Sequence, residues 1–274
     1  MPSLQRGRVT TYYEESGQGE PLVFICGLSA DLQYWRFQVP ALSEHYRVIC
    51  FDNRGAGRSI APDETHSLLD LVDDLVALLD HLEIDSAHVL GHSMGGLIAQ
   101  WLAVSHPKRI RRLVLVGSFA APDGLLRVAI RNWMAIRRSD MPWEQVVRYV
   151  SRWAYGSELA NNEATYEAFI GAAASNRYPQ TLQGFIQQAE ALLAAEASSG
   201  LATVSAPTLV IVGEQDGLAP KYLSEQLVAL IQDSRLQVLP GAHSGFVEYP
   251  EHYNRVFLDF LSDPRHASVG EPLH

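Results

Sequence analysis

The sequence has no long hydrophobic run, little cysteine and a deficit of positive charge. Its 274 residues include 21 Lys and Arg against 31 Asp and Glu, which gives a formal net charge of −10. This acidic balance argues against nucleic acid or an anionic membrane as the main partner. No stretch reaches the roughly 18 apolar residues of a membrane span, and residues 1–20 lack the apolar core of a signal peptide. We therefore expect a cytoplasmic protein that binds neither membranes nor nucleic acid.

The scarcity of cysteine and of metal-binding motifs narrows the chemistry further. The two cysteines, Cys26 and Cys50, fall near the ends of predicted core strands, which favours buried free thiols. The ten histidines show no metal-binding motif, so we expect no metal and no other cofactor. The chain is nevertheless long and 47% hydrophobic, enough for a full core with an inserted subdomain.

A serine stands between two glycines at Gly91-His92-Ser93-Met94-Gly95. An apolar run, Ala87–Leu90, precedes this motif and predicts a buried strand, whereas the residues after it have the periodicity of a helix. Glycines allow a tight bend between strand and helix, and a serine at the apex lies at a helix N-terminus, where negative charge is stabilised. This context favours a nucleophile elbow with Ser93 as the nucleophile. A serine in that role also needs a base and an orienting acid.

Apolar strands alternate with helices along most of the chain. The expected strands are Thr10–Glu14, Leu22–Cys26, Arg47–Phe51, Ala87–Leu90, Arg112–Val116, Thr208–Val212 and Arg235–Leu239. The expected helices among them are Tyr34–Leu42, Leu68–Leu82, Met94–Ser105, Tyr222–Ile231 and Pro250–Leu261. Most of the strands are short continuous apolar runs, which is typical of a parallel sheet covered on both faces. The alternation predicts an α/β fold with a doubly wound, mostly parallel sheet.

Residues 119–199 interrupt this alternation. They contain no convincing strand and four expected helices, at Leu125–Arg138, Trp143–Trp153, Asn162–Ala174 and Pro179–Ala197. The segment follows a core strand, at the sheet edge where open α/β folds bind ligands. We therefore expect a helical cap, or lid, at residues 119–199, inserted into a core made of residues 1–118 and 200–274.

Two later strand ends supply an acid and a base. The strand Thr208–Val212 leads into Gly213-Glu214-Gln215-Asp216, and the strand Arg235–Leu239 is followed by Gly241-Ala242-His243. The carboxyl ends of parallel strands share one edge of a sheet, so these two side chains can meet Ser93 in space. In such a triad the histidine accepts the serine proton and the carboxylate orients the histidine.

Three groups of residues favour structural roles instead. Asp123 also follows a strand and competes with Asp216 as the acid, but Pro122 and Gly124 beside it are typical of a turn. Trp133, Trp143 and Trp153 are expected mainly in the core of the cap, with one or two lining the pocket. One side of the first cap helix is basic and the other apolar, which favours a solvated basic face over a substrate site: Arg127, Arg131 and Arg138 against Leu126, Ala129, Trp133 and Ile136.

These motifs together resemble those of the α/β-hydrolase superfamily, over residues of about 10–118 and 200–262. The resemblance rests on the Ser93 elbow, the Gly213-x-x-Asp216 turn, the Gly241-Ala242-His243 loop and Asp52-Asn53-Arg54-Gly55-Ala56-Gly57-Arg58-Ser59. The last stretch is similar to the family's D-x-R-G-x-G-x-S turn, for which we expect a structural role.

The resemblance implies a catalytic triad of Ser93, Asp216 and His243. It also implies an oxyanion hole made by the backbone N–H groups of Leu28 and Met94. The family usually has His-Gly before the first of these donors, where this chain has Cys26-Gly27. The departure leaves the donor itself intact, because the donor belongs to the backbone.

The activity that the resemblance implies is that of a cofactor-independent serine hydrolase. Such an enzyme cleaves a small-molecule carboxylic ester or lactone through an acyl-enzyme on Ser93, as a carboxylesterase or lactonase does. Within the superfamily, residues Gly27–Trp35 and Gln38–Leu42 are similar to 3-oxoadipate enol-lactonases, although simple esterases share much of this pattern. Hydrolysis of a carbon–carbon bond, perhydrolysis and a ligand receptor with vestigial hydrolysis stay open as alternatives, because one fold hosts many functions.

Overall fold

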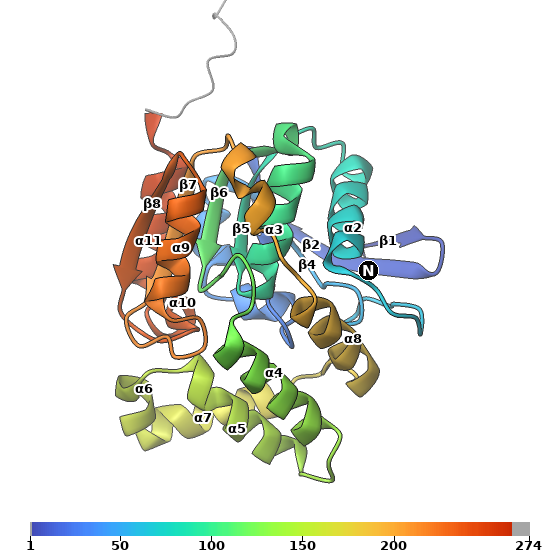
Figure 1. Cartoon of the computed structure of the whole chain (residues 1–274), viewed down its shortest axis with the longest axis vertical. Helices are drawn as coiled ribbons and strands as arrows, with labels where there is room; N and C mark the ends of the chain where they lie inside the picture. Colours follow the sequence, from blue (N-terminus) through green and yellow to red (C-terminus); the bar gives the residue numbers. More distant parts are fainter. Residues whose placement is uncertain (1, 265–274) are drawn as a thin grey trace, which may run out of the picture.

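A single sheet runs through the computed structural model, which describes residues 2–264 (Figure 1). Its strands are β1 (Ser3–Arg6), β2 (Val9–Ser16), β3 (Glu20–Ile25), β4 (Tyr46–Phe51), β5 (Ala87–His92), β6 (Ile110–Val116), β7 (Thr208–Gly213) and β8 (Ser234–Leu239). They lie in the order β1-β2-β4-β3-β5-β6-β7-β8. β2 is antiparallel to both of its neighbours, β1 and β4, and the other neighbouring strands are parallel. This confirms the predicted doubly wound, mostly parallel sheet. Residues 1 and 265–274 of the expected core lie outside the described residues.

Both faces of the central strands are buried, which explains their continuous apolar runs. In β3, Val23 and Ile25 pack into one hydrophobic cluster, whereas Leu22 and Phe24 pack into a second cluster on the opposite face. The first cluster contains residues of α2 (Leu68–His81), α3 (Met94–Ser105) and α9 (Lys221–Leu230), and the second contains residues of α10 (Gly245–Glu248) and α11 (Pro250–Leu261). The sheet is thus the middle layer of a three-layer core, as Figure 1 shows.

The edge strand β1 is the part of the sheet that the sequence did not predict. It pairs only with β2, in an antiparallel hairpin that turns at Gly7 with φ 59°. Three of its four residues are exposed, so it lacks the apolar pattern on which the prediction of the other strands relied.

The expected helix Tyr34–Leu42 is wrong in extent. The segment forms a 3-10 helix, Leu32–Trp35, and a separate single turn, α1 (Val39–Leu42). Pro40 stands in the first turn of α1 and has no N–H with which to continue a helix from the preceding residues. Trp35 ends the 3-10 helix fully buried, stacked on Phe24 at 4.9 Å between ring centroids.

Five helices connect β6 to β7 and form a layer at one end of the molecule (Figure 1). They are α4 (Gly124–Arg137), α5 (Trp143–Ala154), α6 (Ser157–Asn161), α7 (Glu163–Ala174) and α8 (Leu182–Leu193), and we call residues 124–193 the helical insertion. The short α6 was not expected. The fourth expected helix, Pro179–Ala197, is shorter in the structure, because the Thr181 side chain caps α8 by accepting from the Gly184 N–H at 3.0 Å.

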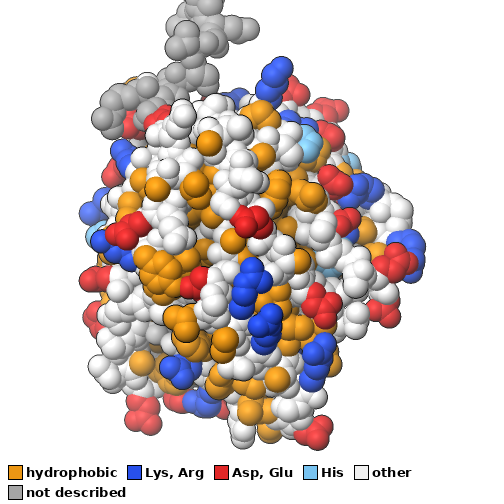
Figure 2. Space-filling view, in the orientation of Figure 1, with side chains coloured by type: hydrophobic (Ala, Val, Ile, Leu, Met, Phe, Trp, Pro, Cys, Tyr) orange, Lys and Arg blue, Asp and Glu red, His pale blue; other side chains and the backbone are white. Residues whose placement is uncertain are grey.

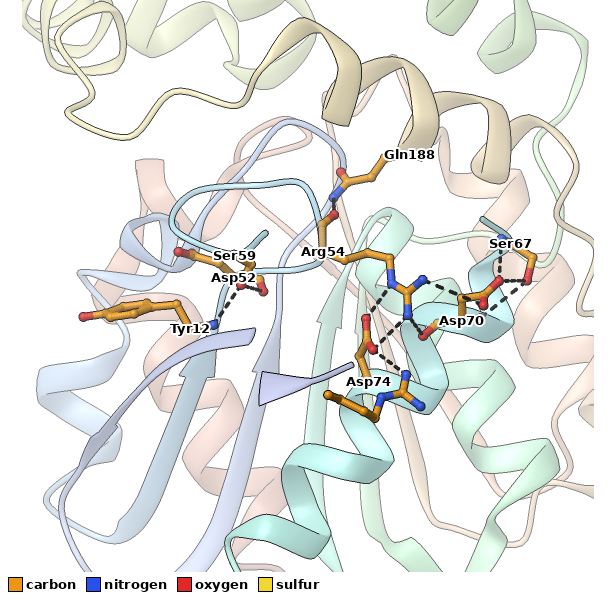
Figure 3. Close-up of polar contacts among 9 residues, drawn as sticks. Tyr12, Asp52, Arg54, Ser59, Ser67, Asp70, Asp74 and Gln188 are labelled. Atoms are coloured by element: carbon orange, nitrogen blue, oxygen red, sulfur yellow. Dashed lines mark hydrogen bonds and ion pairs between the residues drawn. The ribbon is translucent and has the colours of Figure 1, made fainter. Parts of the chain in front are cut away.

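The helical insertion contacts the core backbone to backbone at Gly184. A Cβ built there would lie less than 3.0 Å from the carbonyl oxygen of Gly55, in the turn Asp52–Ser59. One helical turn further along α8, Gln188 Nε2 donates to the carbonyl oxygen of Arg54 at 2.8 Å (Figure 3). The glycine-rich turn is therefore the surface on which α8 rests.

A buried ion pair anchors the same turn to α2. Arg54 donates to both carboxylate oxygens of Asp74, at 2.6 and 2.8 Å, and to the backbone carbonyl of Asp70 at 2.9 Å (Figure 3). Asp74 also forms an ion pair with Arg6 of β1, with 2.6 Å between Asp74 Oδ1 and Arg6 Nη2. Because a buried charge is costly unless it is paired, these contacts fix where the turn lies. The structural role expected for the turn is in keeping with this arrangement.

Charged and apolar side chains are interspersed on the face in Figure 2, with basic side chains gathered over α4. Arg131 of α4 and Arg138, directly after α4, are exposed, as expected. Arg127 departs from the expected solvated face, because it is half-buried and donates to the carbonyl oxygens of Pro122 and Leu193, at 2.9 and 2.5 Å. None of the helices in residues 2–264 has both the length and the apolar composition to cross a membrane.

The glycine contact between α8 and the turn gives a prediction about stability. Gly184→Ala should lower the free energy of unfolding by about 1–3 kcal/mol, because the new methyl group meets the Gly55 carbonyl. Gly171→Ala in α7 is the matched control: nothing lies within 4 Å of a Cβ there, and alanine should stabilise the helix by about 0.5–1 kcal/mol. Urea unfolding of both variants measures the difference. Gly184→Ala protein as stable as the wild type would contradict the close contact.

Candidate active site

Ser93 lies at the turn between β5 and α3 with an unusual backbone conformation, φ 54° and ψ −119°. Positive φ is uncommon for a residue with a side chain and tends to occur at functional sites. The Ser93 N–H donates to the Val116 carbonyl at 2.9 Å, and the Ser93 carbonyl accepts from the Ser118 hydroxyl at 3.0 Å. The neighbouring strand β6 and the residues after it therefore hold this strained turn in place.

The two glycines of the motif are required by close backbone packing. A Cβ at Gly91 would lie less than 3.0 Å from the carbonyl group of Gly95, and a Cβ at Gly95 would lie less than 3.0 Å from the carbonyl groups of Ile25 and Cys26. Because neither position has room for a side chain, α3 can begin directly against the ends of β3 and β5. This is the geometry expected of a nucleophile elbow.

His243 and Asp216 meet beyond the ends of β8 and β7. His243 Nδ1 lies 2.8 Å from Asp216 Oδ2, and both side chains are buried. The other carboxylate oxygen, Oδ1, accepts from the backbone N–H groups of Leu218 and Ala219, at 2.9 and 2.8 Å. The carboxylate is thus fixed by three hydrogen bonds and in turn fixes the imidazole ring.

Gly117, just after β6, is a residue of this site that the sequence did not single out. It has φ 52°, and a Cβ there would lie 3.1 Å from both Asp216 Oδ2 and His243 Nδ1. Strand β6 separates β5 from β7 in the sheet, so the acid–histidine pair must reach across its end. A glycine at that end leaves the pair room to do so.

Asp123, the competing acid, lies elsewhere. Its Oδ1 accepts from the Leu126 N–H at 2.8 Å as the N-cap of α4, and its Oδ2 accepts from the Tyr222 hydroxyl. Both oxygens are therefore occupied by contacts typical of a helix cap. Of the two candidate acids, it is Asp216 that the structure brings to His243.

The backbone N–H groups of Leu28 and Met94 have no acceptor within residues 2–264. Met94 is the first residue of α3, where helical N–H groups lack a partner in their own helix. Leu28 belongs to the loop after β3, and the next residue, Ser29, also has a positive φ of 68°. Each free N–H group therefore lies next in the chain to a residue with positive φ: Leu28 precedes Ser29, and Met94 follows Ser93.

The turn Asp52–Ser59 supports the loop that carries Leu28. Asn53 Nδ2 donates to the Cys26 carbonyl at 2.9 Å, and Asp52 Oδ1 accepts from the Leu32 N–H at 2.8 Å. The same turn is closed by Ser59, whose hydroxyl donates to the Asp52 carbonyl at 2.6 Å and accepts from the Tyr12 N–H at 2.9 Å (Figure 3). The turn therefore sets the position of the loop on the opposite side of the site from His243.

His92 supports the loop that carries His243 through a hydrogen bond to its backbone. Its Nε2 lies 3.0 Å from the His243 carbonyl oxygen, so Nε2 carries the proton in the neutral ring. Burial, and then the neighbouring His243, lower the pKa of His92 well below its ordinary value of 6.5. Tyr34 adds a second support, a hydrogen bond to the hydroxyl of Ser244. Neither contact could be read from the sequence.

A cavity of about 440 Å³ lies between the sheet edge and the helical insertion. Its wall on the core side includes Gly27, Leu28, Ser93 and His243, so three of the candidate residues, Leu28, Ser93 and His243, face one cavity. On the other side it is lined by residues of α4, α5, α7 and α8, among them Trp133, Trp143 and Trp153. All three tryptophans of the insertion therefore reach the cavity, more than the sequence led us to expect.

Two histidines of β5, His88 and His92, stand four residues apart, a spacing that binds metal when it lies on a helix. On a strand they have separate partners: His88 Nε2 lies 3.1 Å from a carboxylate oxygen of Glu20, and His92 bonds to the His243 backbone. Across residues 2–264, no group of three or more His, Cys, Asp or Glu side chains could hold a metal ion. Cys26 and Cys50 are both buried and free, as predicted.

Residues 20–250 match a protein family described as the alpha/beta hydrolase fold. The chain belongs to that alpha/beta hydrolase family. This confirms the resemblance seen in the sequence motifs.

Several members of the alpha/beta hydrolase family resemble the chain along most of its length. It is 32% identical over 270 residues, 96% of the chain and 99% of the relative, to the Azorhizobium caulinodans protein named "Putative carbamate hydrolase RutD". It is 32% identical over 253 residues, 90% of the chain and 91% of the relative, to 3-oxoadipate enol-lactonase 2 of Acinetobacter baylyi. The crystal structure of the enol-lactonase from Burkholderia xenovorans LB400 is similar with a TM-score of 0.87 and 26% identity, covering 96% of this chain and 100% of that one.

The buried His92 gives a prediction about pH for this alpha/beta hydrolase. Because its pKa is lowered in the folded state, the unfolded state binds more protons as the pH falls below 6.5. The contribution of His92 to stability is therefore complete above about pH 6.5 and is lost below it, by at most about 1.4 kcal/mol per pH unit. NMR titration of the histidine rings should show His92, assigned with a His92→Gln variant, titrating well below pH 6.5. A midpoint at 6.5 or above would contradict the burial of an uncharged ring.

Proposed function

We propose that the protein is a cofactor-independent serine hydrolase that cleaves a carboxylic ester or lactone through an acyl-enzyme on Ser93. The observation that supports it most is the convergence of three parts on one cavity. They are the strained serine after β5, His243 with Asp216 behind it at 2.8 Å, and the free N–H group of Leu28. The free N–H group of Met94 belongs to the residue directly after Ser93.

In the proposed reaction the Ser93 hydroxyl attacks the carbonyl carbon of the substrate. His243 accepts the serine proton on Nε2, because its Nδ1 is engaged by Asp216. The N–H groups of Leu28 and Met94 stabilise the oxyanion, each donor contributing about 3–4 kcal/mol in comparable sites. His243 then protonates the leaving alcohol and activates a water that releases the acid and restores Ser93.

The range of substrates is assigned to the helical insertion, which supplies the far wall of the cavity and none of the reacting groups. An ester or lactone of small acyl size suits a cavity of about 440 Å³. The relative from Acinetobacter baylyi is named an enol-lactonase, which favours a lactone. A carbamate is a second candidate, because the relative from Azorhizobium caulinodans is named for carbamate hydrolysis and the same serine chemistry acts on that carbonyl.

A chemical probe tests the nucleophile. A fluorophosphonate should label a single residue, Ser93, because only an activated serine reacts quickly. Labelling should disappear in Ser93→Ala and persist in Ser151→Ala, which removes another serine from the cavity wall. Peptide mapping by mass spectrometry locates the adduct. An adduct on a different serine, or none on protein that hydrolyses esters, would refute the assignment.

A pair of substitutions tests the acid. Asp216→Asn would present an amide NH2 to His243 Nδ1 and favour the wrong tautomer, so kcat should fall on the order of 10⁴-fold. Asp123→Asn, which alters only a helix cap and its contact with Tyr222, should change kcat a few-fold at most. Both are measured on one aryl ester, with folding checked by circular dichroism. Normal turnover in folded Asp216→Asn protein, or a collapse in Asp123→Asn, would reverse the two roles.

A further inference from the structure

Arg137, in the last turn of α4, lines the cavity and forms no ion pair within residues 2–264. It is half-buried, and this burial lowers the pKa of its guanidinium. One of its N–H groups donates to the Gln180 carbonyl at 2.8 Å. A partly desolvated cation without a counter-ion is unfavourable, since buried charges are normally paired. An anionic ligand in the cavity would supply the missing partner.

Aromatic rings hold this guanidinium in place. Its central carbon lies 4.8 Å from the ring centroid of Trp143 and 4.8 Å from that of Phe185. Such contacts engage the face of the guanidinium plane and leave its N–H edge for acceptors. An arginine held in this way is suited to bind a planar carboxylate through two parallel hydrogen bonds.

The side-chain amide of Gln180 is a second unpaired group in the same wall. Gln180 is 8% exposed, and neither Oε1 nor Nε2 has a partner in the described part of the chain. Its backbone carbonyl is the acceptor of the Arg137 bond, so the residue that carries this amide lies beside the guanidinium in space. A buried amide without hydrogen bonds is unfavourable, and a ligand oxygen would satisfy its donor.

The charge of the cavity wall is positive, although the protein is acidic overall. Of the described residues that line it, Asp31 is the only carboxylate, whereas Arg36 and Arg137 are both cationic. Asp31 is already engaged, by Asn176 Nδ2 at 2.7 Å and by the Gln33 N–H at 2.9 Å. With one carboxylate against two guanidinium groups, a substrate in the cavity meets a wall of net positive charge.

We propose that Arg137, with Gln180 beside it, binds a carboxylate of the substrate, so that the natural substrate is an ester or lactone that also carries a free carboxylate. This inference rests on the proposed function for the reacting bond. The binding of the carboxylate itself is independent of it, because Arg137 belongs to the helical insertion and none of the reacting groups does.

The test compares a charged substrate with a neutral one of the same length. The ratio of kcat/KM for monomethyl adipate to that for methyl hexanoate should exceed 1 in the wild type. Arg137→Gln should lower this ratio roughly tenfold or more, as expected for loss of a charge-assisted hydrogen bond, and Arg137→Lys should retain part of it. Because both substrates are measured on the same protein, the ratio does not depend on how much of a variant is folded.

Arg138→Gln is the matched control. It removes the same charge from the neighbouring, exposed position of the chain and should leave the ratio unchanged. A ratio that stays the same in Arg137→Gln, or that falls equally in both variants, would overturn the proposal.

Calorimetric titration with adipate separates this proposal from the proposed function. Adipate should bind the wild type and Arg138→Gln, and bind at least tenfold more weakly to Arg137→Gln. Adipate binding that depends on Arg137, in a protein that hydrolyses neither ester, would support the carboxylate site and refute the hydrolase. Ester hydrolysis with no effect of Arg137 on either measurement would refute only the carboxylate site.

Discussion

The arrangement of the site depends on the close approach of Gly91, Gly95 and the end of β3. Backbone there meets backbone with no space for a Cβ, so α3 begins immediately where β5 ends. This packing forces Ser93 into its positive φ and turns its side chain toward the cavity. A larger residue at either glycine would push α3 away from the sheet and move Ser93, together with the Met94 N–H group, away from the N–H group of Leu28.

The order of the strands imposes the second constraint. Strand β6 lies between the strand that carries the serine and the one that leads to Asp216, while His243 follows the outermost strand. The acid and histidine therefore have to reach over the end of β6, and Gly117 leaves the space for them. His92 and Tyr34 then hold the histidine loop from the other side. The placement of the proposed triad thus depends on several buried residues that have no proposed role in the reaction.

The helical insertion supplies the wall of the cavity that we propose selects the substrate. It rests on the core through Gly184 and Gln188, against a turn that Arg54 anchors to α2. Because that turn also supports the loop carrying Leu28, the same few contacts position both the cavity wall and the proposed oxyanion donors. Arg137 in that wall, which forms no ion pair within residues 2–264, is the feature that most narrows the proposed substrates, to those that also carry a free carboxylate.

The sequence by itself determined the fold class, the strands from β2 to β8 and the residues of the proposed triad. These follow from local signals: continuous apolar runs, glycines at a strand–helix turn, and polar residues directly after strands. It did not reveal β1, which has no apolar pattern, or the break at Pro40 within an expected helix. The turn residues beside Asp123 favoured Asp216 in the sequence, but both acids follow strands. Only the tertiary structure shows which of the two meets His243. Likewise Arg137 could not be told from the neighbouring Arg138 in the sequence, since helix geometry and the packing of α4 against α5 and α8 decide which of the two reaches the cavity.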